Sequence, residues 1–273
     1  MSEIKPPSLA AAPAVAPEDS LAAWQAQDPA VLAQEVLRLR AELQARRDDQ
    51  QAFLRVVSHD LRSPVRHVVS YGQLVRELVL ESNADPAALQ FLDTITQSAQ
   101  QLGRMIDGLI ALGRIGTAEL QLQALPLGEV LQDALRQAQA SAPDRCVQWQ
   151  VPELAALPAV RADLALLRDL LRHLLDNALK FTRQRPDAEI ALTAAVDGTQ
   201  LVLTLRDNGA GYNPEHQAQL FGVFQRLHAT RDFEGLGLGL AAARRIVDRL
   251  GGQISLHGEL NQGCTVTLQL PLA

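Results

Sequence analysis

The chain has 273 residues, a formal net charge of −6 and 47% hydrophobic residues, enough for one or two domains with buried cores. An acidic chain without long Lys/Arg runs gives no support to general nucleic-acid binding. Two cysteines, Cys146 and Cys264, are too few for a disulfide framework, which favours a reducing compartment. No apolar run reaches the roughly 18 residues of a membrane span, and prolines interrupt the N-terminus where a signal sequence would lie. We therefore expect a cytoplasmic protein without a membrane span and without a nucleic-acid partner.

The N-terminal region divides into two parts. Residues 1–20 are rich in Ala, Pro and Ser, and such a composition buries too little side chain to offset the entropy of ordering, so we predict a disordered tail. Residues 21–50 have helical periodicity, with a 4-3-4 spacing that is typical of a coiled coil at Leu32, Val36, Leu39 and Leu43. No recognised sensor domain is expected in residues 1–50.

Residues 51–116 are predicted to form a helical hairpin. The first helix runs from Gln51 to Leu80 and is broken at Asn83, Asp85 and Pro86. The second is predicted to end at Gly113 and Gly116, and it carries a heptad seam at Leu92, Ile95, Ala99, Leu102, Ile106 and Leu109. Because one hairpin leaves an apolar stripe exposed, we predict a homodimer with a four-helix bundle.

Residues 117–273 have a mixed pattern that favours an α/β sandwich, with helices on one face of a sheet. An Asp197-Gly198 pair marks a β-hairpin between two of the predicted strands. Strands are expected at Val147–Val151, Glu189–Val196, Gln200–Leu205, Gln253–His257 and Thr265–Leu270, and helices at Leu127–Gln139, Asp163–Thr182 and Leu240–Leu250. The predicted fold class is thus α plus α/β: a dimeric helical hairpin followed by an α/β sandwich.

A histidine on the first hairpin helix is a candidate nucleophile. At 100° per residue, His59 points almost opposite the apolar stripe and therefore faces solvent. Its imidazole is largely neutral at pH 7, and the adjacent Asp60 could hold the proton on the other ring nitrogen. Pro64, one turn further on, is expected to kink the helix. On these residues alone, a solvated histidine beside a solvated aspartate is the favoured interpretation.

The predicted helix Asp163–Thr182 carries a polar face at i, i+4 and i+7. His173, Asn177 and Lys180 lie within about 60° of one another on it. The amide oxygen of Asn177 could ligate Mg²⁺, and Lys180 could pair with a phosphate. An amphipathic helix with an ordinary polar face is the alternative.

Two glycine-rich segments follow. In the first, Asp207 ends a strand and could accept a hydrogen bond from an adenine amino group, while Gly209 and Gly211 let the backbone approach the ring; an ordinary turn is the alternative. The second, Gly235-Leu236-Gly237-Leu238-Gly239, opens a helix whose free N–H groups favour phosphate. Between them, the polar stretch Asn213–Glu234 is predicted to be a mobile lid.

Taken in order, these segments resemble the motifs of two-component histidine kinases, whose ATP domain is similar to the gyrase/Hsp90/kinase/MutL superfamily. The segment 58–64 resembles the phosphoacceptor box, 177–182 the N box, 207–211 the G1 box, 220–224 the F box and 235–239 the G2 box. Phe224–His228 and the acceptor segment look most like the kinase modules attached to bacterial phytochromes. The resemblance covers roughly residues 45–273.

The resemblance implies a role for each matching residue. His59 would accept the γ-phosphoryl group of ATP, with Asp60 as general base or orienter. The ATP site would comprise Asn177, which ligates Mg²⁺, together with Lys180, Asp207, Gly209, Gly211, Arg226, Gly235, Gly237, Gly239 and Thr265. His173 stands where many relatives carry a first asparagine. Implied partners are a second copy of the chain, a response regulator receiver domain and a separate sensory protein.

The predicted domains are therefore a tail (1–20), a coiled coil (21–50), a dimerisation and phosphotransfer domain (51–116) and a catalytic ATP-binding domain (117–273). The predicted function is ATP-dependent autophosphorylation on His59 and transfer to an aspartate of a response regulator. Two alternatives stay open: a phosphotransfer or scaffold protein with an inactive ATP domain, and another ATPase of the superfamily, such as a chaperone or anti-sigma kinase. Acid-labile label on the protein would separate them.

Overall fold

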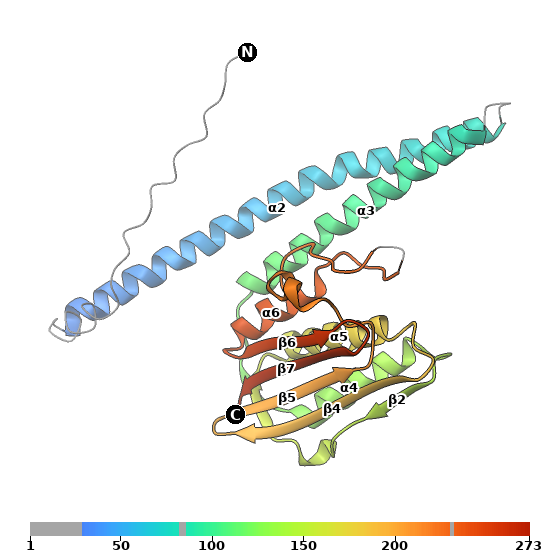
Figure 1. The fold of residues 1–273 in the computed structure, drawn as a ribbon. Helices are drawn as coiled ribbons and strands as arrows, with labels where there is room; N and C mark the ends of the chain where they lie inside the picture. Colours follow the sequence, from blue (N-terminus) through green and yellow to red (C-terminus); the bar gives the residue numbers. More distant parts are fainter. Residues whose placement is uncertain (1–28, 82–85, 230–231) are drawn as a thin grey trace. The chain divides into compact units, whose positions relative to one another are not determined.

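The computed structural model describes residues 29–81, 86–229 and 232–273 (Figure 1). The tail predicted for residues 1–20 lies outside them, as do the side chains of Leu32 and Leu43 in the predicted coiled coil. The chain divides into two compact units after Gln50. Within the described helices, no segment combines the length and the apolar character needed to cross a membrane.

Two long helices form the predicted hairpin. Helix α2 spans Pro29–Glu81 and helix α3 spans Pro86–Thr117, and Pro64 lies inside α2 without ending it. The antiparallel register of the two helices is marked by two ion pairs: Arg62 to Asp107 at 2.6 Å and Arg76 to Asp93 at 3.0 Å. Two ion pairs at opposite ends of the hairpin define how the helices lie side by side.

Helix α3 differs from the prediction at its end, because it continues through Gly113 and Gly116 to Thr117. A glycine inside a helix costs roughly 1 kcal/mol relative to alanine, so packing must offset that cost. A Cβ at Gly116 would overlap the guanidinium of Arg245. Leu112 of α3 is also buried against Ala241 and Ala242 of helix α6. The end of α3 is therefore held by tertiary contacts that no local pattern reveals.

A five-stranded sheet forms the second half of the molecule, in the order β2-β4-β5-β7-β6. Strand β2 (Val147–Gln150) runs parallel to β4 (Ala188–Asp197), and the remaining neighbours are antiparallel. The other strands are β5 (Gln200–Asp207), β6 (Gln253–Glu259) and β7 (Gly263–Pro271). Gly198, with φ +58°, makes the predicted turn between β4 and β5.

Three helices cover one face of this sheet: α4 (Leu127–Ala140), α5 (Leu164–Phe181) and α6 (Gly239–Arg249). Their leucines interdigitate with the inward residues of the strands in one core, in which Leu167, Leu170 and Ile190 are fully buried. The predicted α/β sandwich is confirmed, with helix bounds within a residue or two of those expected.

Four short elements escaped prediction. Strands β1 (Gln123–Pro126) and β3 (Ala159–Ala162) pair antiparallel in a separate two-stranded sheet, and a 3₁₀ turn, η1, spans Leu154–Ala156. A second 3₁₀ turn, η2 (Pro214–Gln219), lies within the predicted lid. Four-residue elements offer too little periodicity to be recognised from local pattern.

The opposite face of the sheet carries polar side chains. Strand register places Thr204 of β5 beside Thr193 of β4 and Thr267 of β7. Arg206 pairs with Thr265, and Thr265 with His257. Because side chains alternate along a strand, these residues point away from the core.

Candidate nucleotide site

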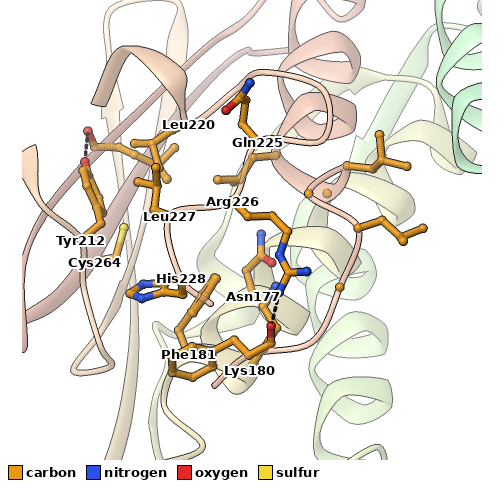
Figure 2. A pocket seen from close by; sticks show the side chains of 18 of the residues that line it. Asn177, Lys180, Phe181, Tyr212, Leu220, Gln225, Arg226, Leu227, His228 and Cys264 are labelled. Carbon is orange, nitrogen blue, oxygen red and sulfur yellow. Dashed lines mark hydrogen bonds between the residues drawn. The ribbon is translucent and has the colours of Figure 1, made fainter. Parts of the chain in front are cut away.

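A cavity of about 320 Å³ lies between α5, the lid and the start of α6. Figure 2 shows Asn177 and Lys180 from α5, Arg226 and His228 from the lid, and Cys264 from β7 around it. The cavity therefore gathers parts of α5, the lid, the start of α6 and β7, which are separated by up to about 90 residues of chain.

The polar face of α5 points into this cavity because its apolar face is committed to the core. Asp163 begins the helix by accepting hydrogen bonds from the N–H groups of Ala165 (3.0 Å) and Leu166 (3.2 Å). His173, Asn177 and Lys180 all line the cavity. The N-cap and the leucine stripe together fix the rotation of α5 and hence the direction of these three side chains.

The glycine loop passes close to both the lid and α5. The N–H of Phe224 donates to the carbonyl of Gly237 at 3.0 Å, and a Cβ at Gly237, whose φ is +71°, would lie 2.5 Å from the carbonyl oxygen of Gln225. Phe224 itself has φ +61°, which is strained for a bulky residue. Only glycine fits at position 237, because the backbone of the lid is too near for any side chain.

Positive charge converges at the same end of the cavity. Lys180 Nζ lies 4.3 Å from the centre of the Phe181 ring, and burial, followed by the charge of Arg226, lowers the pKa of Lys180. Burial is also the main cause that lowers the pKa of His173, and it therefore favours the neutral imidazole. Helix α6 begins at Gly239, and its N-cap residue, Leu238, makes no side-chain hydrogen bond to the first N–H groups. Lys180, Arg226 and this helix terminus form a site suited to phosphate groups.

Aromatic rings lie beside these charged groups in the wall of the cavity. Phe181, His228 and Phe233 form a triangle with ring centres 5.1–5.4 Å apart. His228 Nε2 donates to the carbonyl oxygen of Gly211 at 2.8 Å, and Arg226 Nη2 donates to that of Phe233 at 2.6 Å. These contacts hold the lid against α5, and the flat rings provide a surface on which a base could stack.

Asp207 lies at the end of β5 and is 6% exposed. It accepts a hydrogen bond from the N–H of Gly209 at 2.9 Å, and burial raises its pKa to about 6. Its cross-strand neighbour is Cys264, whose pKa is raised to about 12 by burial and by the charge of Asp207. A buried carboxylate of this kind is a common feature of functional sites.

The structure brings most, but not all, of the predicted site residues together. Seven line the cavity: Asn177, Lys180, Gly211, Arg226, Gly235, Gly237 and Gly239. Asp207 and Gly209 are not among the lining residues, although Asp207 is the cross-strand neighbour of Cys264, which is one. Thr265 lies on the opposite face of the sheet. His59 and Asp60 are in α2, but their side chains lie outside those described, so the predicted exposure of His59 stays a prediction.

Several lining residues were not among the predicted site residues, and they include Phe181, Tyr212, His228 and Cys264. Aromatic residues make up only 4% of the chain, so Phe181 directly after Lys180 was a usable signal. The alternation of side chains along β7 was a second usable signal. Cys264 lies on the same face of the strand as Val266 and Leu268, which are buried.

The donor set fits a nucleotide and its divalent cation. Asn177 offers an amide oxygen and His173 a ring nitrogen, and a Cβ at Gly239 would lie 3.7–3.8 Å from both side chains. The absence of a side chain at Gly239 leaves room between α5 and α6 for phosphate oxygens.

Two family models match the chain. The "His Kinase A (phospho-acceptor) domain" matches residues 49–118, and the "Histidine kinase-, DNA gyrase B-, and HSP90-like ATPase" matches residues 162–273. The chain therefore belongs to the histidine kinases, with a phosphoacceptor hairpin followed by an ATPase domain. The resemblance drawn from the sequence motifs is confirmed.

Curated relatives agree with this assignment. The methanogenesis regulatory histidine kinase FilI of Methanothrix harundinacea is 30% identical over 84% of this chain and 25% of its own length. The phytochrome-like protein Cph1 of Synechocystis sp. is 28% identical over 88% of this chain and 31% of its own length. The chain thus spans about a quarter to a third of these relatives.

Solved structures share the fold. Full-length ShkA in complex with AMPPNP aligns with a TM-score of 0.57 and 26% identity, over 81% of this chain and 46% of that one. The Acinetobacter baumannii histidine kinase AdeS aligns with a TM-score of 0.53 and 18% identity, over 78% of this chain and 98% of that one. The second likeness concerns the fold alone.

Proposed function

We propose that this chain uses Mg-ATP to phosphorylate His59 and passes the phosphoryl group to an aspartate of a response regulator receiver domain. The observation that carries the proposal is the convergence of Asn177, Lys180, Arg226 and the α6 N-terminus on one cavity. His59 and Asp60 lie in the segment that matches a phosphoacceptor domain. Because ATP is supplied in the cytoplasm, we propose that the chain acts there.

The proposed chemistry assigns one task to each residue. His59 attacks the γ-phosphorus with a ring-nitrogen lone pair, and the bond to the β–γ bridging oxygen breaks, so that ADP leaves with that electron pair. Asp60 takes or holds the proton of the other ring nitrogen. Lys180 and Arg226 balance charge on the transferred group.

The remaining site residues would hold the nucleotide. Asn177 would ligate Mg²⁺, whose charge neutralises the phosphate oxygens. Asp207 would accept a hydrogen bond from the adenine amino group at the end of β5, beside Gly209 and Gly211. Gly235, Gly237 and Gly239 would offer backbone N–H groups to the phosphates.

We further propose a homodimer formed through the hairpin. Apolar residues of both helices are exposed in the single chain at heptad spacing: Leu61, Val68 and Val75 on α2, and Ile95, Leu102 and Leu109 on α3. A second hairpin would bury both rows in a four-helix bundle. A separate sensory protein would then act on the N-terminal helix.

The test is incubation of the purified chain with γ-labelled ATP. We expect acid-labile, alkali-stable label on the wild type, and none on His59→Gln, because an amide lacks the nucleophilic ring nitrogen. His67→Gln, on the same helix, is the matched control and should label normally. Steady phosphate release without label would favour another ATPase, and neither label nor release would favour an inactive scaffold.

A further inference from the structure

His173 is a polar residue of α5 that the proposed catalytic scheme does not use. It lines the cavity one helical turn before Asn177, whereas its neighbours Leu171 and Leu174 are buried in the core. Among the described residues, no hydrogen bond or ion pair is formed by the His173 side chain. A neutral imidazole is thus available inside the site.

The imidazole of His173 and the side-chain amide of Asn177 both lie close to Gly239. The position that a Cβ would take on Gly239 lies 3.8 Å from His173 Nδ1, 3.8 Å from Asn177 Oδ1 and 3.7 Å from Asn177 Nδ2. Gly239 is the first residue of α6. A ring nitrogen and an amide oxygen therefore approach the same point at the phosphate-binding end of a helix.

The charge around this point determines what it can bind. The positive end of a helix dipole disfavours a bare cation but favours phosphate, and no cluster of three His, Cys, Asp or Glu suited to a metal exists among the described residues. A divalent cation would therefore bind only together with nucleotide phosphates. Mg²⁺ and Mn²⁺ both favour oxygen ligands, but Mn²⁺ tolerates an imidazole nitrogen better than Mg²⁺ does.

We propose that His173 and Asn177 form a mixed nitrogen–oxygen site for the nucleotide-bound cation, and that His173 biases this site toward Mn²⁺ over Mg²⁺. The inference rests on the proposed nucleotide binding. The competing role, in which His173 donates a hydrogen bond to a phosphate, gives no metal–nitrogen bond.

Pulsed electron paramagnetic resonance of the full chain with Mn²⁺ and AMPPNP distinguishes these roles. We expect ¹⁴N modulation from a coordinated imidazole in the wild type, with a ¹⁵N pattern after labelling with ¹⁵N-histidine. The modulation should vanish in His173→Asn, and the ratio of Mn²⁺ to Mg²⁺ affinity should fall. His257→Asn, on the uncovered face of the sheet, is the matched control and should keep the signal.

A wild-type complex that binds Mn²⁺-AMPPNP without imidazole modulation overturns the inference and leaves the proposed function standing. An unchanged signal in His173→Asn overturns it equally. If the Mn²⁺-AMPPNP complex stays unbound to the protein, nucleotide binding itself is refuted, and the proposed function falls together with this site.

Discussion

At the scale of single residues, Asp207 is where stability and proposed function conflict. A carboxylate that is 6% exposed is needed as an acceptor, yet burial favours its protonated form and raises its pKa from 3.8 to about 6. The folded chain therefore holds the proton more tightly than the unfolded chain, so stability is lost as the pH rises between these two values.

We expect this loss to be measurable against Asp207→Asn, which does not titrate. The free energy of unfolding of the wild type, relative to this variant, should fall by roughly 2–3 kcal/mol between pH 4 and pH 6 and stay level above. Urea unfolding across this range is the measurement. A difference that rises with pH would mean that the carboxylate is stabilised in the fold rather than strained.

A second residue-scale prediction compares two glycines of similar conformation. Gly211 has φ +60° and Gly198 has φ +58°, but a Cβ at Gly211 would overlap the carbonyl of Glu259, whereas Gly198 has no atom within 4 Å. Gly198→Ala should cost about 1 kcal/mol, the cost of the left-handed conformation. Gly211→Ala should cost about 1–3 kcal/mol more, because the backbone must move. Equal losses in thermal unfolding would contradict the close approach.

At the scale of elements, the lid is held by two unlike kinds of contact. Phe233 is 4% exposed and packs on Phe181 and His228. Glu234 pairs with Arg183 at 3.3 Å, but its side chain is 82% exposed. Exposed pairs contribute little, whereas a buried ring contributes several kcal/mol.

Phe233→Ala should therefore open the lid, and Glu234→Gln should not. Hydrogen exchange at the amide of Phe224, which donates to Gly237, reports closure directly. We expect that exchange to accelerate by two orders of magnitude or more in the first variant, about 3 kcal/mol of lost closure, and to change little in the second. Equal protection in both variants would argue that the backbone alone closes the lid.

The elements also explain what the sequence could and could not predict. Helix α5 was predicted well because its leucine stripe and its N-cap Asp163 are local signals. Strands β1 and β3 were not, because four residues are too few to show a periodic pattern, and these strands form a sheet only through long-range pairing. Thr265 was placed in the site by motif position, although strand parity puts Cys264 on the cavity side. The register of a strand decides which of two adjacent residues faces the cavity, and a sequence motif does not specify that register.

At the scale of the whole molecule, the exposed row on α3 predicts assembly. Ile95 is 50% exposed in the single chain, and a second hairpin would bury it. Ile95→Asp should separate the 29.6 kDa chains, because burying an unpaired charge costs several kcal/mol. Light scattering measures the mass. Gln97→Asp, 200° away on the same helix, adds the same charge off the seam and should stay dimeric; a monomeric wild type would exclude the bundle.

The order of strands has a consequence for the lid. Strands β5 and β7 are hydrogen-bonded neighbours, yet the lid, α6 and β6 all intervene between them in sequence. The lid therefore belongs to a detour that leaves the sheet at the end of β5 and returns to it, after α6, at β6. Lengthening such a detour costs little, about 0.6 kcal/mol for each doubling of a flexible loop. A peptide inserted between Pro214 and Gln225, or a protease cut there, would leave both flanking strands paired, so this segment can be rebuilt or severed while the sheet stays assembled.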